Sequence, residues 1–353
     1  MHMCLQACQT PGWWLARERA VCLPAMGEFD LISRYFTRPA TRAVLGVGDD
    51  CALLQPPAGM QLAISSDMLV EGRHFFADVD PFSLGHKALA VNLSDLAACG
   101  ARPLAFTLAL ALPRVDEAWL EPFSRGMLAL ADAHGCELVG GDTTQGPLNI
   151  CITVFGEVPR GQALLRSGAR AGDDIYVSGT LGDARLALEI LRGKVAAPAP
   201  VLTAARLRLE RPTPRVALGL ALRGIATAAI DVSVGLLGDL GHVLKQSGVG
   251  ATVKTDVAID LVAACAYWTG AKGLFFSEIG LDQRLGWALA GGDDYELLFT
   301  APAASRASVA DASSASQTQV TRIGHIDNER GLRLVDAEGR ALPNTFSSFD
   351  HFA

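Results

Sequence analysis

Five times along this chain, a short apolar segment ends in glycine or serine with an aspartate beside it. The segments are VLGVGDD (44–50), LAISSD (62–67), ELVGGD (137–142), AIDVS (229–233) and ALAGGDD (288–294). Short apolar runs that end in turn residues are typical of buried strands. Stretches with helical spacing lie between several of these runs. The alternation predicts an α/β protein whose carboxylates lie at the ends of strands.

The first half of the chain is expected to alternate strands and helices. Asp80 can cap a helix that has Pro81 in its first turn, and Gly135 can end the next helix. The expected elements are a strand at 61–65, a helix from 81 to about 99, a strand at 104–112, a helix at 116–134, and strands near 136–140 and 149–157.

The second half is expected to repeat this pattern. The chain becomes rich in glycine and arginine over 159–172, and we place a domain boundary near 160. The expected elements are a strand at 175–178, a helix at 183–192, an exposed loop at 194–201, helices near 214–228 and 236–247, strands near 251–254, 294–300, 320–326 and 332–335, and a surface helix or loop at 303–318. Two α/β domains are predicted, 27–159 and 160–353.

The first 26 residues are expected to be an extension outside these domains. They contain three cysteines and adjacent tryptophans, Trp13 and Trp14, but sustain neither a helical nor a strand period. They also lack the basic and apolar regions of a secretory signal. We expect residues 1–26 to be disordered, or Met26 to be the natural start.

Composition excludes several classes of function. The net charge is −7 and no basic block occurs, so nucleic acid is not an expected partner. No apolar run reaches the roughly 18 residues of a membrane span. The eight cysteines include no CxxC pair, which favours reduced thiols in a cytoplasmic protein. The P-loop, the GxGxxG fingerprint of dinucleotide-binding domains and the GxSxG elbow of hydrolases are all missing.

The carboxylates predict a magnesium-dependent phosphoryl transfer. A single Gly-Asp pair is more often a turn, and Asp95 alone could be a hydrogen-bonded buried residue or part of an exposed stripe. Taken together, the five segments favour a cluster, and Asn92 lies on the helix face that carries Asp95. Aspartate oxygens are hard ligands suited to Mg²⁺, and cations held there would attract phosphates.

Eight segments in order resemble thiamine-monophosphate kinases, a family of the aminoimidazole ribonucleotide synthetase superfamily. They are GEFDLISRYF, GVGDDCALL, SSDMLVEGRHF, HKALAVNLSDLAACGARP, GGDTTQGP, RSGARAGDD, AIDVSVGLLGDLGH and GGDDYEL, within 27–352. The resemblance implies transfer of phosphate from ATP to thiamine monophosphate. It also implies a homodimer whose N-terminal sheets form a barrel, a C-terminal α/β sandwich, and a binding cleft between the domains.

The resemblance also assigns site residues, motif by motif. The implied magnesium ligands are Asp50, Ser65, Ser66, Asp67, Asp95, Asp142 and Asp231. The implied ATP-binding residues are Gly141, Asp142, Arg166 and Ser233, and the implied substrate-binding residues are His74, Asp293 and Phe346. Without the resemblance, His74 could equally be an ordinary loop residue, and Phe346 is more typical of a core residue. No catalytic general base is predicted.

Two positions depart from the family pattern. The family usually reads IDxSDG where this chain has Asp231, Ser233 and Val234, so a valine replaces the second aspartate. We expect one magnesium site to be lost or weakened. Asp293 stands where the family usually has glutamate. The aspartate keeps the negative charge, but its side chain is one methylene shorter.

Two other functions remain open at this point. Val234 allows a catalytically weakened or silent protein that only binds nucleotide or thiamine phosphate. A superfamily member that acts on another substrate is the second possibility. The selenophosphate branch is disfavoured, because Cys4, Cys8 and Cys22 lack its glycine-rich context.

Overall fold

The N-terminal half is a four-stranded sheet with two long helices on one face. In the computed structural model, residues 27–261 and 279–346 are described, so the extension expected at 1–26 lies outside them. The elements are α1 (Glu28–Leu31), a π-helical turn (Ile32–Phe36), β1 (Met60–Val70), α2 (Pro81–Ala98), β2 (Arg102–Leu112), α3 (Glu117–His134), β3 (Glu137–Gln145) and β4 (Asn149–Pro159). The strand order is β1-β4-β2-β3, and only β2 and β3 are parallel.

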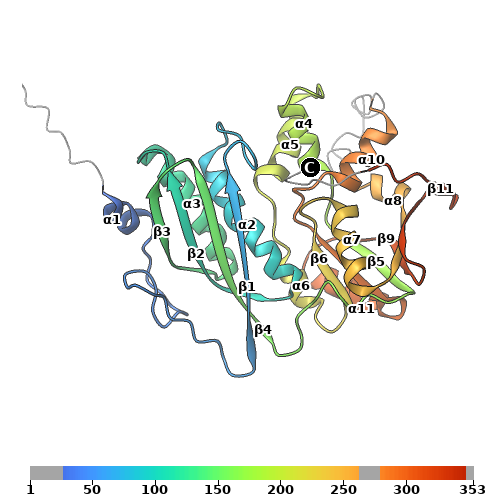
Figure 1. Ribbon diagram of the computed structural model, residues 1–353, viewed down its shortest axis with the longest axis horizontal. Helices are drawn as coiled ribbons and strands as arrows, with labels where there is room; N and C mark the ends of the chain where they lie inside the picture. The colour runs from blue at the N-terminus through green and yellow to red at the C-terminus, as the bar shows by residue number, and fades with distance from the viewer. Residues whose placement is uncertain (1–26, 262–278, 347–353) are drawn as a thin grey trace, which may run out of the picture.

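The C-terminal half is a seven-stranded mixed sheet flanked by shorter helices (Figure 1). Its strand order is β11-β10-β7-β9-β5-β8-β6. The elements are β5 (Asp173–Ser178), α4 (Asp183–Leu191), α5 (Ala199–Glu210), α6 (Val216–Ala221), β6 (Ala228–Asp231), α7 (Leu236–Ser247), β7 (Gly250–Lys254), α8 (Thr255–Ile259), α10 (Leu281–Ala290), β8 (Leu297–Pro302), a 3₁₀ turn (Ala303–Ser305), α11 (Arg306–Ala315), β9 (Val320–Asp327), β10 (Gly331–Val335) and β11 (Ala341–Leu342).

Most of the expected elements form, and the local signals behind them are visible. The Asp80 carboxylate accepts a hydrogen bond from Ser83 N at 2.9 Å and caps α2. Gly135 ends α3 in the left-handed conformation, with φ of 59°. The fold class is confirmed as two α/β halves with mixed sheets.

Three expected boundaries are wrong. The loop expected at 194–201 already contains the first turn of α5, which begins at Ala199 after Pro198. The helix expected at 214–228 ends at Ala221, because a turn with Gly224 at φ 73° leads into β6. The strand expected from 294 begins at Leu297, because Asp293 and Tyr295 both have positive φ angles.

Helix α2 is the central element, and glycines let its neighbours approach closely. A Cβ atom on Gly85 of α2 would lie 2.0 Å from Phe123 O of α3, and one on Gly126 of α3 would lie 2.0 Å from Phe82 O. A Cβ on Gly219 of α6 would lie 2.0 Å from Ala97 O. Only glycine allows such contacts. Helix α2 is therefore held tightly between α3 and the C-terminal half.

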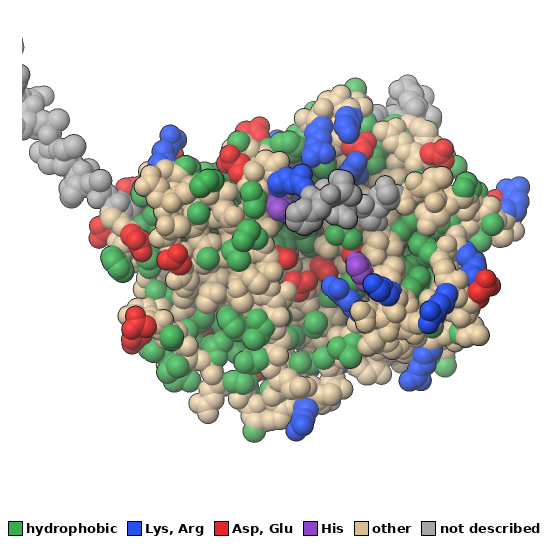
Figure 2. All heavy atoms as spheres, in the orientation of Figure 1, with side chains coloured by type: hydrophobic (Ala, Val, Ile, Leu, Met, Phe, Trp, Pro, Cys, Tyr) green, Lys and Arg blue, Asp and Glu red, His purple; other side chains and the backbone are tan. Residues whose placement is uncertain are grey.

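The face of the four-stranded sheet that points away from α2 and α3 carries exposed apolar side chains. On β1, Leu62, Ile64 and Met68 are 42%, 60% and 51% exposed. Figure 2 shows apolar side chains gathered over this part of the molecule. Among the described residues, no helix combines the length and the apolar character that crossing a bilayer requires.

Candidate active site

Three carboxylates meet where the two halves of the chain come together. Asp67 lies on β1, Asp95 on α2 and Asp231 at the end of β6; we call them the central carboxylates. Ser65 Oγ donates to Asp95 Oδ2 at 2.5 Å. Ser94 Oγ donates to Asp231 Oδ2 at 2.8 Å. Figure 2 shows acidic side chains in a recess between the halves, with basic side chains beside it.

Local geometry explains how this cluster forms. Side chains alternate along a strand, so Ser65 and Asp67 point to the α2 side while Ser66 points away. Ser66 Oγ lies 2.9 Å from Thr153 Oγ1 on the open face instead. Asn92 Oδ1 accepts a hydrogen bond from Asp67 N at 3.0 Å and ties β1 to α2. The side chain of Ser66 therefore does not join the cluster.

Within 27–261 and 279–346, the positive charge near the central carboxylates is too small to balance them. Burial, followed by the charge of Asp95, raises the pKa of Asp67 to about 6. Burial also raises the pKa of Asp95, although the hydrogen bond from Ser65 and the charge of Arg166 oppose this. Burial and the charge of Asp95 raise the pKa of Asp231. Crowded buried carboxylates favour a bound cation.

The loop after β6 is organised by a further buried carboxylate. Asp239 Oδ2 accepts hydrogen bonds from the backbone N–H groups of Ser233, Val234 and Gly235 at 3.0, 3.1 and 3.1 Å. Burial raises the pKa of Asp239 to about 6, while these three hydrogen bonds and Arg166 lower it. Ser233 and Arg166, both predicted to bind ATP, are therefore brought close to the central carboxylates.

A second group of predicted residues lies at the far edge of the same sheet. Asp50, Gly141 and Asp142 line one pocket beside β3. Asp67 on β1 pairs with Ile152 on β4, which pairs with Leu108 on β2, which in turn pairs with Gly141 on β3. Asp67 and Gly141 are therefore three strand spacings of about 4.8 Å apart, a distance of about 14 Å. One subunit therefore does not bring these residues to the central carboxylates.

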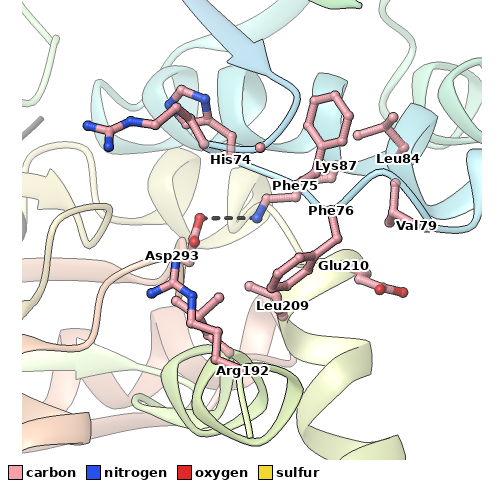
Figure 3. Close-up of a pocket in the computed structure, with 13 residues that line it drawn as sticks. His74, Phe75, Phe76, Val79, Leu84, Lys87, Arg192, Leu209, Glu210 and Asp293 are labelled. Atoms are coloured by element: carbon pink, nitrogen blue, oxygen red, sulfur yellow. Dashed lines mark hydrogen bonds and ion pairs between the residues drawn. The ribbon is translucent and has the colours of Figure 1, made fainter. Parts of the chain in front are cut away.

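The predicted substrate residues His74 and Asp293 share a pocket between the halves (Figure 3). Phe75, Phe76 and Leu209 supply apolar walls. His74 Nδ1 accepts a hydrogen bond from Val70 N at 3.0 Å, so the neutral ring carries its proton on Nε2. The pocket thus combines apolar surface with a carboxylate and a ring N–H, as expected for a small organic ligand.

Phe346 lies elsewhere. It is partly buried against the C-terminal core. A Cβ on Gly286 of α10 would lie 4.0 Å from its ring, and Phe346 is not among the residues that line the pocket. Its predicted contact with substrate therefore stays a prediction.

Sequence reasoning missed two residues in this pocket region, Lys87 and Tyr295. Lys87 Nζ lies 3.1 Å from Asp293 Oδ1, and the Tyr295 hydroxyl donates to the same oxygen at 3.2 Å. The sequence does contain a feature that could have pointed to Lys87: Lys87 and Asp95 are the charged residues among the mostly apolar residues 81–98. A lysine in a buried helix needs a partner.

The residues are suited to hold Mg²⁺ only together with further oxygen ligands. Among the described residues, no group of three or more His, Cys, Asp or Glu side chains is arranged to hold a metal ion on its own. Mg²⁺ is usually bound by one or two carboxylates, waters and substrate phosphates. The donor chemistry of Asp67, Asp95 and Asp231 fits an ion that arrives with a nucleotide.

Comparison with known proteins assigns the fold. Residues 48–158 match the family "AIR synthase related protein, N-terminal domain", and residues 170–337 match "AIR synthase related protein, C-terminal domain". The two matched ranges span most of both halves described above.

The most similar curated proteins and solved structures include thiamine-monophosphate kinases. The chain is 45% identical to thiamine-monophosphate kinase of Salmonella typhimurium, over 93% of this chain and 99% of that protein. It is 42% identical to the Haemophilus influenzae protein of the same name, over 93% and 98%.

The crystal structure of thiamine-monophosphate kinase from Stenotrophomonas maltophilia matches with a TM-score of 0.75 and 47% identity, over 85% of this chain and 92% of that chain. The structure of AaThiL complexed with AMPPCP and TMP matches with a TM-score of 0.68 and 29% identity, over 84% and 89%. This chain belongs to the thiamine-monophosphate kinase family.

Proposed function

We propose that this protein transfers the γ-phosphate of ATP to thiamine monophosphate, which yields ADP and thiamine diphosphate. The observation that carries the proposal is the cluster of buried carboxylates Asp67, Asp95 and Asp231 beside a pocket that contains Asp293. Family membership supports it, as does the related structure complexed with AMPPCP and TMP, which we take as an ATP analogue and thiamine monophosphate.

The proposed reaction needs positioning and charge neutralisation more than proton transfer. The acceptor is already an ionised phosphate, so no general base is required. Asp67, Asp95 and Asp231 would hold Mg²⁺, which supplies neutralisation of the phosphate charges. The exposed guanidinium of Arg166, close to Asp95 and Asp239, can contact phosphate oxygens. Asp293 can accept a hydrogen bond from the substrate's ring system.

We further propose that the protein is a homodimer in which each active site takes residues from both subunits. The exposed apolar face of β1 is a surface that a second copy could cover. Asp142 and Asp67 lie on opposite edge strands of one sheet, at the same level. When two such sheets join edge to edge as a barrel, β3 of one subunit meets β1 of the other, which supplies Asp142 and Asp50 across the interface.

Mixed dimers test this shared site. Asp231→Asn and Asp142→Asn subunits, each inactive alone, are co-expressed with different tags, and the dimer that carries both tags is purified. One of its two sites then contains no substitution, so we expect about half of the wild-type turnover per dimer. A doubly tagged dimer with no turnover would show that each site belongs to one subunit.

The proposed reaction is tested with purified protein, Mg-ATP and thiamine monophosphate, with thiamine diphosphate followed by chromatography. Multiple turnovers would establish the kinase. Binding of ATP and thiamine monophosphate without product would favour the silent homologue, and failure to use thiamine monophosphate would favour a different acceptor.

Restoring the family's aspartate in the loop after β6 is expected to increase activity. Val234 is partly exposed and directly follows Ser233 near Asp231. Val234→Asp adds one oxygen ligand, so we expect a several-fold higher kcat and a lower Mg²⁺ concentration for half-maximal rate. Val234→Asn is the matched control, because asparagine has nearly the volume of aspartate without the charge. Equal turnover and equal Mg²⁺ dependence in Val234→Asp and wild type would contradict the idea that a metal site is weakened.

Mg²⁺ is expected to stabilise the protein more at pH 8 than at pH 5. The pKa of Asp67 is about 6, above the roughly 3.9 of an unfolded aspartate. Its ionisation therefore opposes folding: the penalty is absent below about pH 4 and complete above about pH 6. Mg²⁺ favours the ionised form and removes this penalty.

Thermal unfolding with Mg-ADP and with EDTA, at both pH values, measures this difference. Asp67→Asn serves as the control, because it removes the titrating group. A Mg²⁺-dependent gain that is equal at pH 5 and pH 8 in wild type would contradict a role for Asp67 in holding the ion.

A further inference from the structure

Asp293 is held by its backbone and by one of its two carboxylate oxygens. Its N–H donates to Ser233 O at 2.9 Å, and Tyr295 N–H donates to Val232 O at 2.9 Å. Asp293 and Tyr295 have φ angles of 61° and 50°. Positive φ is uncommon for a non-glycine residue and a genuine outlier for a bulky one such as tyrosine. The loop is therefore fixed against the segment that follows β6.

Two donors converge on the same oxygen of Asp293. Lys87 Nζ and the Tyr295 hydroxyl lie 3.1 and 3.2 Å from Oδ1. The Lys87 side chain is 4% exposed, whereas the Asp293 side chain is 35% exposed and lines the pocket. Figure 3 shows Lys87 reaching from α2 to Asp293. No residue within 27–261 or 279–346 donates a hydrogen bond to Oδ2.

The buried ammonium of Lys87 forms an ion pair with the Asp293 carboxylate. A carboxylate in such a pair can accept hydrogen bonds but cannot donate one. The oxygen left for a ligand is then an acceptor only, which selects an N–H donor and rejects a carbonyl at the same place.

We propose that Lys87 and Tyr295 are positioning residues that hold Asp293 Oδ1, so that Oδ2 selects an amino group on the substrate's ring system. The inference rests on the proposed function, because the amino group is that of the aminopyrimidine ring of thiamine monophosphate. This arrangement of Asp293 makes the pocket favour an amino substituent over an oxo substituent at that ring position.

The test compares two substrates, thiamine monophosphate and oxythiamine monophosphate, in which an oxo group replaces the amino group. In wild type we expect kcat/KM to favour the amino substrate by about 100-fold or more. Lys87→Met keeps an unbranched side chain without the charge, and we expect the preference to fall at least about tenfold, mainly through KM of the amino substrate. Lys87→Arg keeps the charge and should keep most of the preference.

Two further variants make the result decisive. Tyr295→Phe removes one donor to Oδ1, so the preference should fall about threefold. Lys194→Met removes a charge from an exposed lysine that does not line the pocket, and should leave the preference unchanged. If Lys87→Met does not fold, as judged by thermal unfolding, Tyr295→Phe decides.

The possible failures are distinguishable. Wild type that does not phosphorylate thiamine monophosphate would remove the proposed function itself. Wild type that uses both substrates equally, or a preference that stays at the wild-type value in Lys87→Met and Tyr295→Phe, would overturn the positioning role while the kinase activity stands. If Lys87→Met lowered kcat/KM by the same factor for both substrates, Lys87 would have a role in packing alone.

Discussion

Replacing Asp231 with asparagine is expected to lower turnover by at least about 100-fold while the fold is kept. Asp231 is 5% exposed, and burial together with the charge of Asp95 raises its pKa. Asparagine has nearly the same shape and can still accept the hydrogen bond from Ser94 Oγ. The substitution removes the negative charge available to Mg²⁺ and relieves repulsion between carboxylates.

Activity and stability should therefore change in opposite directions. We expect the metal-free Asp231→Asn protein to unfold at the same or a higher temperature than wild type at pH 8. Chromatography of thiamine diphosphate and thermal unfolding in EDTA measure the two quantities. An active variant, or one that is strongly destabilised without metal, would be inconsistent with Asp231 as a magnesium ligand.

Replacing Glu296 with glutamine is expected to lower the free energy of unfolding by about 3–5 kcal/mol. Glu296 is fully buried and forms ion pairs of 2.6 Å with both Arg208 and Arg215. Ser178 Oγ donates to its other oxygen at 2.6 Å. The substitution leaves two largely buried guanidinium groups without the charge of Glu296, and this cost is large because few waters can reach them.

Urea unfolding followed by circular dichroism measures this loss. Glu329→Gln is a matched control, since Glu329 pairs with Arg333 but is 86% exposed at its side chain. Exposed pairs contribute little, so the control should change the free energy of unfolding by no more than about 0.5 kcal/mol. Similar losses in the two variants would refute the argument from burial.

The sequence predicted local features better than long-range ones. Asp80, Pro81 and Gly135 act within one helical turn, so the limits of α2 and α3 could be read directly. The boundary before β8 was harder to predict, because the positive φ of Tyr295, two residues before the strand, depends on contacts with the loop after β6.

The site was predictable in parts for the same reason. The motifs pointed to the carboxylates one by one, and the structure brings three of them, Asp67, Asp95 and Asp231, to the junction of the two halves. The separation of Asp142 from Asp67 depends on the strand order β1-β4-β2-β3, which no local pattern encodes. The role of Lys87 was equally hidden, since its partner Asp293 lies 206 residues away in the chain.

Helix α2 also fixes the distance between the two ends of the proposed site. Lys87 and Asp95 are eight residues apart on this helix, and at about 1.5 Å per residue their positions differ by about 12 Å along its axis. Glycine contacts at Gly85, Gly126 and Gly219 prevent the helix from sliding. In the proposed function, helix α2 would therefore fix the distance between the residues that contact the substrate's ring and those that contact its phosphate. Acceptors with a shorter or longer linker between ring and phosphate would fit one end and miss the other.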